Sequence, residues 1–151
     1  DIGNLVFLGI HNRGVPIARR LKENILGITN IDIPNGSLDI TFHRDDYRDR
    51  LLMPEIRGTD IPFNLDDKVV ILVDDVLFSG RTIRAALDEI ISFGRPSIVR
   101  LAVLIDRGHR ELPIRADFIG KNIPTNSGEH VQVYLNDTDE EEGVFIIREE
   151  Y

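Results

Sequence analysis

The chain has 151 residues, of which 42% are hydrophobic and 29% are charged, a composition typical of one globular domain with a single core. Because it contains no cysteine, disulfides, thiolate catalysis and cysteine-ligated metal centres are excluded. No apolar run reaches membrane-spanning length and no leader peptide is visible, so we expect a cytoplasmic domain over residues 1–151.

The charge of the chain is unevenly distributed along it. The net charge is −8, but residues 136–151 alone carry −6. The rest of the chain is therefore nearly neutral, and residues 95–121 carry a local +3. A basic face is compatible with this acidic chain.

The first part of the sequence predicts a strand, a turn and a helix. LVFLGI at residues 5–10 is an apolar run of strand length, and VPIARRLKENIL at 15–26 has apolar residues at helical spacing. LDITFH at 38–43 predicts a second strand. Residues 44–64 lack either periodicity and predict a long loop, which is either a lid over a site or simply disordered. Because the first strand begins so early, we also expect that an N-terminal segment is missing.

The second part continues the alternation of strands and helices. VVILV at 69–73 predicts a central strand buried on both faces, and residues 83–91 predict an amphipathic helix that Gly94 ends. IVRLAVLI at 98–105 predicts another core strand, while residues 131–135 and 144–147 are candidate antiparallel strands. The sequence thus predicts an α/β fold with a central, mainly parallel sheet flanked by helices and a small β extension.

The segment from Asp74 to Thr82 lies where ligands bind in such sheets, at the carboxyl end of a strand. Two adjacent carboxylates can accept hydrogen bonds from a sugar diol or help to hold a hydrated Mg²⁺. The turn Phe78–Thr82 then leads into a helix, whose N-terminus and hydroxyl groups can bind a phosphate. The alternative is a solvated acidic pair followed by a helix cap. The complete order of features favours binding of a sugar phosphate.

This order resembles the binding signature for 5-phosphoribosyl-1-pyrophosphate (PRPP) in type I phosphoribosyltransferases. The resemblance implies that Asp74 and Asp75 bind the ribose hydroxyls. It also implies a phosphate loop made of Val76, Leu77, Phe78, Ser79, Gly80, Arg81 and Thr82. A pyrophosphate loop follows the first strand of that family. Asn12 and Arg13 lie at the matching place, although HNRG read by itself is only a polar turn.

A narrower resemblance is to the PyrR family of bacterial pyrimidine-operon regulators, which also have uracil phosphoribosyltransferase activity. It is carried by residues 101–125, by DITFHRDD and by the loop through GTDIPF. Purine-salvage enzymes of the fold carry a proposed catalytic aspartate at the position of Phe78, so this chain lacks that base. The usual PyrR residue there is tyrosine. The implied fold has a small β-containing hood and an N-terminal helical segment, which this chain is expected to lack. The implied reaction converts uracil and PRPP to UMP and diphosphate.

The same resemblance assigns further substrate contacts. Arg107 is expected at the substrate site, and Val131 is expected to present backbone groups to the pyrimidine, although periodicity alone makes Val131 an ordinary strand residue. Arg44 and Arg57 are plausible PRPP contacts if the long loop closes; solvated arginines are the simpler alternative. Mg²⁺ is expected to bind mainly through PRPP and water, with Arg13, Asp74 and Asp75 as the groups that support catalysis. No metal ligand set of the protein itself is expected.

Regulation is also implied, through uridine-nucleotide-dependent (UMP or UTP) binding to the mRNA leader of pyrimidine genes in transcriptional attenuation. His109, Arg110 and Arg115 match the basic, RNA-facing positions of PyrR, and the chain is expected to form a homo-oligomer. RGHRELPIR taken alone is a charged turn, for which solvation is the commoner explanation. Two alternatives stay open: a phosphoribosyltransferase for another base, and an RNA-binding regulator with vestigial catalysis.

Overall fold

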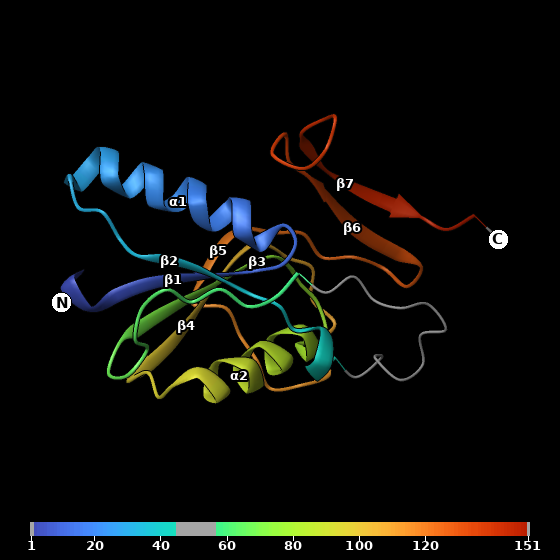
Figure 1. Ribbon diagram of the computed structural model, residues 1–151. Coiled ribbons are helices and arrows are strands. Elements are labelled where there is room, and N and C mark those ends of the chain that lie inside the picture. Colours follow the sequence, from blue (N-terminus) through green and yellow to red (C-terminus); the bar gives the residue numbers. More distant parts are fainter. Residues whose placement is uncertain (1, 45–56, 151) are drawn as a thin grey trace.

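Five parallel strands form the centre of the molecule. The computed structural model describes residues 2–44 and 57–150 of the chain. Along the sheet the strands are β2 (Asn35–Leu38), β1 (Leu5–Ile10), β3 (Val69–Leu77), β4 (Ile98–Asp106) and β5 (Phe118–Asn122). All four pairings between neighbours are parallel, so the carboxyl ends of these strands meet at one edge of the sheet (Figure 1).

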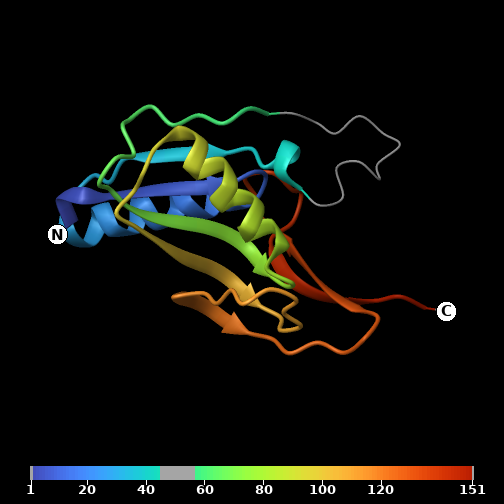
Figure 2. The same cartoon turned by 90° about the horizontal axis from the view of Figure 1, so that it is seen from below.

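Two helices cover opposite faces of this sheet. Helix α1 (Gly14–Thr29) lies on one face and α2 (Arg81–Phe93) on the other (Figures 1 and 2). Strand β3 is buried on both faces: Val70 and Leu72 belong to the cluster that packs on α2, and Ile71 and Val73 to the cluster that packs on α1. This explains the absence of polar residues from the first half of β3, because side chains alternate between the two faces of a strand.

A separate antiparallel hairpin covers part of the α1 face. It consists of β6 (Glu129–Tyr134) and β7 (Gly143–Arg148), joined by residues 135–142, which we call the hood turn. Val131, Val133 and Leu135 are buried in the same cluster as residues of α1, β1, β3 and β4. Their burial fixes the first strand of the hairpin against the body of the domain, near the start of α1 (Figure 1).

The predicted strand at 38–43 is wrong in its extent. Strand β2 ends at Leu38, and a short 3-10 helix, η2, covers Thr41–His43; another, η1, covers Ile2–Asn4. The chain turns because the buried Asp39 carboxylate accepts hydrogen bonds from the backbone N–H of Thr41, Arg57 and Gly58, at 2.7–2.9 Å. These bonds draw both ends of the long loop together. Residues 45–56 of the predicted lid lie outside the described residues.

The other predicted strands and both helices are confirmed, with small shifts at their ends. Strand β5 was not predicted. All of its residues are exposed and β4 is its only neighbour in the sheet, so it carries neither an apolar run nor a strict alternation. Among the helices that the structure describes, none is long and apolar enough to span a bilayer.

Candidate active site

Three chain segments that carry predicted site residues meet at the carboxyl edge of the sheet. Arg13 follows β1, the segment from Asp74 to Gly80 ends β3, and Arg107 follows β4. The first two segments approach closely, because a Cβ on Gly14 would lie 2.3 Å from the carbonyl oxygen of Val73. Only glycine fits there, so this residue allows the turn after β1 to lie directly against β3.

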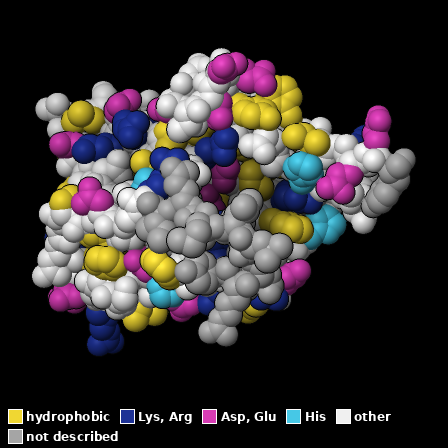
Figure 3. All heavy atoms as spheres, turned by 45° about the vertical axis from the view of Figure 1, so that its right-hand side comes forward, with side chains coloured by type: hydrophobic (Ala, Val, Ile, Leu, Met, Phe, Trp, Pro, Cys, Tyr) yellow, Lys and Arg dark blue, Asp and Glu magenta, His cyan; other side chains and the backbone are white. Residues whose placement is uncertain are grey.

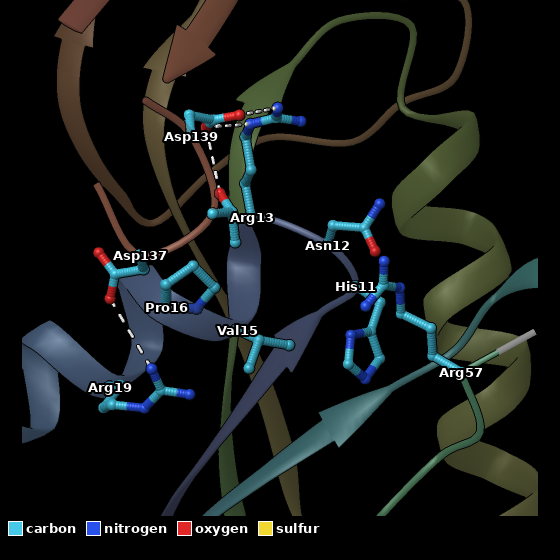
Figure 4. Close-up of a pocket in the computed structure, with 10 residues that line it drawn as sticks. His11, Asn12, Arg13, Val15, Pro16, Arg19, Arg57, Asp137 and Asp139 are labelled. Atoms are coloured by element: carbon cyan, nitrogen blue, oxygen red, sulfur yellow. Dashed lines mark hydrogen bonds and ion pairs between the residues drawn. The ribbon is translucent and has the colours of Figure 1, made fainter. Parts of the chain in front are cut away.

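The turn after β1 opens into a polar pocket of about 340 Å³. Figure 4 shows that the side chains around it come from the turn after β1, the beginning of α1, the segment after the long loop and the hood turn. The lining residues are His11, Asn12, Arg13, Val15, Pro16, Arg19, Arg57, Asp137, Thr138 and Asp139. The predicted pyrophosphate residues Asn12 and Arg13 and the loop residue Arg57 are therefore brought to one pocket.

The charges in this pocket are paired across it. The Arg13 guanidinium binds the Asp139 carboxylate with Nη2–Oδ1 at 2.9 Å, and the outer Arg19 lies 3.7 Å from Asp137. On the other side, burial lowers the pKa of His11, an effect that the Asp39 charge opposes and the Arg57 charge reinforces. The neutral imidazole is thus favoured beside the arginines. Figure 3 shows basic and acidic side chains adjoining on this face.

The two aspartates of β3 differ in their surroundings. Asp74 lies within strand β3, which continues beyond the predicted residues 69–73, and it is only 7% exposed. Burial, followed by the charge of Asp75, raises the pKa of Asp74 well above its usual range. Asp75 is half-buried and accepts a hydrogen bond from the Val76 N–H at 2.8 Å. Asp75 is therefore the more accessible of the two predicted ribose ligands.

The predicted phosphate loop forms the turn from β3 into α2. Gly80, with φ of 94°, is the residue that precedes the helix, and the Ser79 hydroxyl accepts a hydrogen bond from the Arg81 N–H at 3.3 Å. The first N–H groups of a helix have no carbonyl partner within it and attract anions. The loop backbone is also held from outside, because the N–H groups of Glu111 and Leu112 donate to the Ser79 carbonyl at 2.9 and 3.0 Å.

Arg107 lies beside this loop and covers the ring of Phe78. Its guanidinium carbon is 4.0 Å from the ring centroid, and Nε donates to the Thr125 hydroxyl at 3.2 Å. The Arg107 Nη2 donates to the carbonyl oxygen of Glu129 in β6. Phe78 itself is 43% exposed, so the ring and the guanidinium form a surface open to a planar ligand.

The backbone N–H and C=O groups of Val131 face the side of β6 on which Glu129 binds Arg107, although the Val131 side chain is buried. Gly128 accepts a hydrogen bond from Glu149 across the hairpin at 3.2 Å, and the register continues with Glu129 opposite Arg148. In an antiparallel pair, residues with groups that face the partner strand alternate with residues whose groups face away. Val131 therefore points its N–H and C=O away from β7, as Glu129 does where it binds Arg107.

The three predicted RNA contacts have different environments. Arg110 donates to the carbonyls of Ile114 and Phe78, each at 2.8 Å, and its Nη2 binds the Asp106 carboxylate at 2.5 Å. His109 contacts the Thr125 carbonyl with Nε2 at 2.6 Å. Arg115 is exposed. Arg110 thus supports the predicted phosphate loop, whereas the sequence had suggested only a contact with RNA.

Two further observations concern the loop and metals. Arg44 is exposed at the beginning of the long loop, and its predicted contact with PRPP stays a prediction. Within residues 2–44 and 57–150, no three His, Asp or Glu side chains gather in a way that could hold a metal ion by themselves.

Comparison with known proteins identifies the family. Residues 1–138 match the phosphoribosyl transferase domain. A protein of Pelotomaculum thermopropionicum called Bifunctional protein PyrR is 55% identical over 145 residues, which cover 96% of this chain and 80% of that protein. A protein of the same name from Deinococcus deserti is 57% identical and covers 90% and 74%. The chain belongs to the PyrR family of phosphoribosyltransferases.

Solved structures agree on the fold of this PyrR-family chain. The hypoxanthine phosphoribosyltransferase of Trypanosoma cruzi matches with a TM-score of 0.67 at 19% identity, covering 97% of this chain and 77% of that one. A Staphylococcus aureus hypoxanthine phosphoribosyltransferase gives 0.59 at 21% identity, with 86% and 66% covered. The predicted type I phosphoribosyltransferase fold is thereby confirmed.

Several pocket residues were missed from the sequence. His11, Arg19, Asp137 and Asp139 line the pocket, yet none was assigned a role. The two acids lie within the acidic segment 136–151, and the two arginines they pair with lie at the beginning of the chain. The sequence shows a basic turn near one end and an acidic turn near the other, but no local pattern indicates that they meet.

Proposed function

We propose that this PyrR-family chain transfers the phosphoribosyl group of PRPP to uracil, giving UMP and pyrophosphate, and that it regulates pyrimidine genes by binding their mRNA leader in response to UMP or UTP. We call the pocket beside Arg13 the cationic pocket, because its three arginines outnumber its two aspartates. The observation that carries the transferase assignment is the convergence of this pocket, a phosphate loop and an aromatic–arginine surface at one edge of the sheet. These three parts fit pyrophosphate, 5-phosphate and a planar base.

The residues divide the substrate among them. The backbone of Phe78–Thr82 and the N-terminus of α2 would hold the 5-phosphate, and the Asp75 carboxylate would accept hydrogen bonds from the ribose hydroxyls. The base would lie against the Phe78 ring and Arg107, with its polar edge toward the backbone of Val131. Arg13 and the adjacent Asn12 would then face the pyrophosphate.

Departure of pyrophosphate leaves positive charge on the ribose and places negative charge on the leaving group. Arg13 would stabilise the leaving group, because a fixed cation aimed at developing charge lowers the barrier. Mg²⁺, when bound to PRPP, supplies additional positive charge on the pyrophosphate oxygens. The half-buried Asp75 carboxylate would accept hydrogen bonds from water around the ion, which fits an ion held mainly through substrate.

The position of Phe78 bears on the choice of base. It cannot act as a proton acceptor, so the chemistry of this site must proceed without a side-chain base at that place. A transferase for another base is the second candidate, and an RNA regulator with vestigial catalysis is the third. The backbone conformation of the phosphate loop and the arginines of the pocket favour retained turnover.

The decisive assay measures UMP formation from PRPP and uracil with Mg²⁺, with hypoxanthine, guanine and orotate in parallel. We expect UMP formation with uracil and no product with the other three bases. Turnover with another base would assign the chain to that base, and binding of UMP without turnover would support the regulator. Leader binding in the presence and absence of UMP, followed across a salt series, tests the regulatory proposal. Size-exclusion chromatography with light scattering tests the proposed homo-oligomer.

A further inference from the structure

Arg13 of the cationic pocket is bound edge-on by an acid from the far end of the chain. Its Nε donates to Asp139 Oδ2 at 3.3 Å and its Nη2 donates to Asp139 Oδ1 at 2.9 Å (Figure 4). The two residues are 126 positions apart, and their side chains are 26% and 15% exposed. Two parallel bonds of this kind fix the plane of a guanidinium as well as its distance.

The Asp139 carboxylate is itself held in place by the hood turn. Its Oδ2 also accepts hydrogen bonds from the Leu135 N–H at 2.8 Å and the Thr138 hydroxyl at 3.1 Å. The carbonyl of Leu135 in turn accepts the N–H groups of Thr138 and Asp139 at 2.9 and 2.7 Å, and the Leu135 side chain is buried in the core. The carboxylate is thus attached to the body of the domain through Leu135.

This arrangement keeps Asp139 ionised and leaves donors of Arg13 available. The hydrogen bond from Arg13, followed by that from the Leu135 N–H, holds the pKa of Asp139 below its ordinary value. A guanidinium has five N–H groups, and Asp139 takes one from Nε and one from Nη2. In Figure 4 the remaining nitrogen, Nη1, lies on the side of the guanidinium away from Asp139.

We infer that Asp139 is a positioning residue for the transfer reaction: it fixes the Arg13 guanidinium by one edge so that the other donors meet the pyrophosphate of PRPP. This inference rests on the proposed function and deepens it, because it assigns the acidic hood turn to the leaving-group side of the site. A flexible arginine would lose rotamer entropy on binding the anion, and a guanidinium that is already oriented loses less.

The alternative is that the same contact has the opposite role and opposes substrate binding. A carboxylate that occupies Arg13 only while the pocket is empty would have to be displaced by the substrate, and its charge would repel the incoming pyrophosphate. The bonds from Leu135 and Thr138 argue for a fixed carboxylate, since neither of them involves Arg13. The two roles predict opposite signs for the effect of removing the charge.

The experiment measures binding of inorganic pyrophosphate with Mg²⁺, of PRPP and of UMP by calorimetry to the full chain and to Asp139→Asn. We expect pyrophosphate and PRPP to bind at least tenfold more weakly to the variant. UMP, which has no pyrophosphate, should bind within twofold of the parent. The matched control is Glu142→Gln, which removes one charge from the same turn but pairs with Arg20 instead of Arg13. It should bind all three ligands like the parent.

A double-mutant cycle separates positioning from a merely structural role. If Asp139 acts through Arg13, Asp139→Asn should have little further effect on pyrophosphate binding in an Arg13→Ala background. An undiminished effect in that background, or equal losses for pyrophosphate and UMP, would overturn the inference. Tighter pyrophosphate binding to Asp139→Asn would overturn the inference and establish that the carboxylate opposes substrate binding. If the parent forms no UMP but the cycle behaves as expected, the proposed reaction fails while the positioning of Arg13 stands.

Discussion

The Arg110 guanidinium donates to the carbonyl oxygen of Phe78 at 2.8 Å, which joins the segment after β4 to the phosphate loop. The same side chain binds the Ile114 carbonyl and the Asp106 carboxylate, and the side-chain bond from Arg110 holds the pKa of Asp106 low against the opposing effect of burial. A basic segment proposed to contact RNA is therefore mechanically connected to the turn proposed to hold the 5-phosphate.

The first prediction separates Arg110 from Arg115. Arg110→Ala should weaken UMP binding about tenfold, because it leaves the Phe78 and Ile114 carbonyls without this donor and loosens the phosphate loop. Arg115→Ala removes an exposed side chain and should leave UMP binding unchanged. Calorimetry with UMP on both single variants measures the difference. Equal UMP affinities for the two variants would contradict the bracing role.

RNA binding by the same two variants gives the complementary measurement. If Arg115 contacts a phosphate of the leader, Arg115→Ala should reduce the slope of log K against log salt by about 1. Filter binding or fluorescence anisotropy across a salt series measures this slope. An unchanged slope would place the RNA interface elsewhere or remove it. In that case Arg115 is a solvated residue of a charged turn.

A second prediction concerns the unequal aspartates of β3. Asp75→Asn should weaken PRPP binding at least tenfold, since it removes a ribose acceptor at the accessible position.

Asp74→Asn should raise the thermal stability of the ligand-free protein at neutral pH. The pKa of Asp74 is raised in the fold, so its protonated form is favoured there, and stability is lost as pH rises from the unfolded pKa through the folded one.

Thermal melts of Asp74→Asn and the parent between pH 4 and pH 8 test that sign. The gap between the two melting temperatures should widen as the pH rises. Asp75→Asn removes the second cause of the raised pKa of Asp74, so its melting temperature should gain on the parent with rising pH as well, but by less. A gap that stays constant with pH would show that the pKa of Asp74 is the same in the folded and the unfolded protein.

Much of this fold follows from the sequence, because apolar runs and helical spacing determine β1, β3, β4 and both helices. What could not be predicted depends on contacts between distant residues. Asp39 ends β2 early by binding the N–H groups of residues 57 and 58, and Asp139 reaches Arg13 from the opposite end of the chain. The family resemblance predicted a phosphate loop, but it did not assign the acidic segment to the pocket.

A third prediction uses Asp39, which holds the two ends of the long loop together. Burial raises the pKa of this carboxyl, but hydrogen bonds from Thr41, Gly58 and Arg57 outweigh that effect and lower it to about 2. Relative to the ordinary value of 3.8, this stabilises the folded protein by about 2 kcal/mol at neutral pH. Asp39→Asn should lose about that amount, because its amide N–H groups cannot accept from the loop backbone.

The sign of the pH dependence follows from the lowered pKa. The stabilisation by Asp39 is complete above the unfolded pKa and is lost as pH falls from about 4 through about 2. Urea unfolding of the parent and of Asp39→Asn should therefore differ most at neutral pH and converge toward pH 2. Asp60→Asn, an exposed neighbour in the same loop region, is the matched control and should follow the parent. A difference that persists at pH 2 would show that packing, and not ionisation, carries the effect.

The last prediction tests the surface proposed for the base. Arg107 stacks on Phe78 at 4.0 Å and is fixed there by bonds to the Thr125 hydroxyl and the Glu129 carbonyl. Lysine keeps the charge, but its N–H donors are all on one nitrogen and it has no planar group. Arg107→Lys therefore cannot bridge Thr125 and Glu129 while covering the ring. We expect the KM for uracil to rise about tenfold, with the KM for PRPP changed much less.

The control for this substitution is Arg100→Lys, an exposed arginine of β4 that lies 3.5 Å from Asp117 and far along the strand from the site. Steady-state kinetics with each substrate varied in turn measures both KM values. Equal increases for uracil and PRPP would mean that Arg107 supports the whole site and does not select the base. An unchanged KM for uracil would show that the base does not bind at the Arg107–Phe78 surface, because removal of the planar guanidinium must weaken the binding of a base that contacts it.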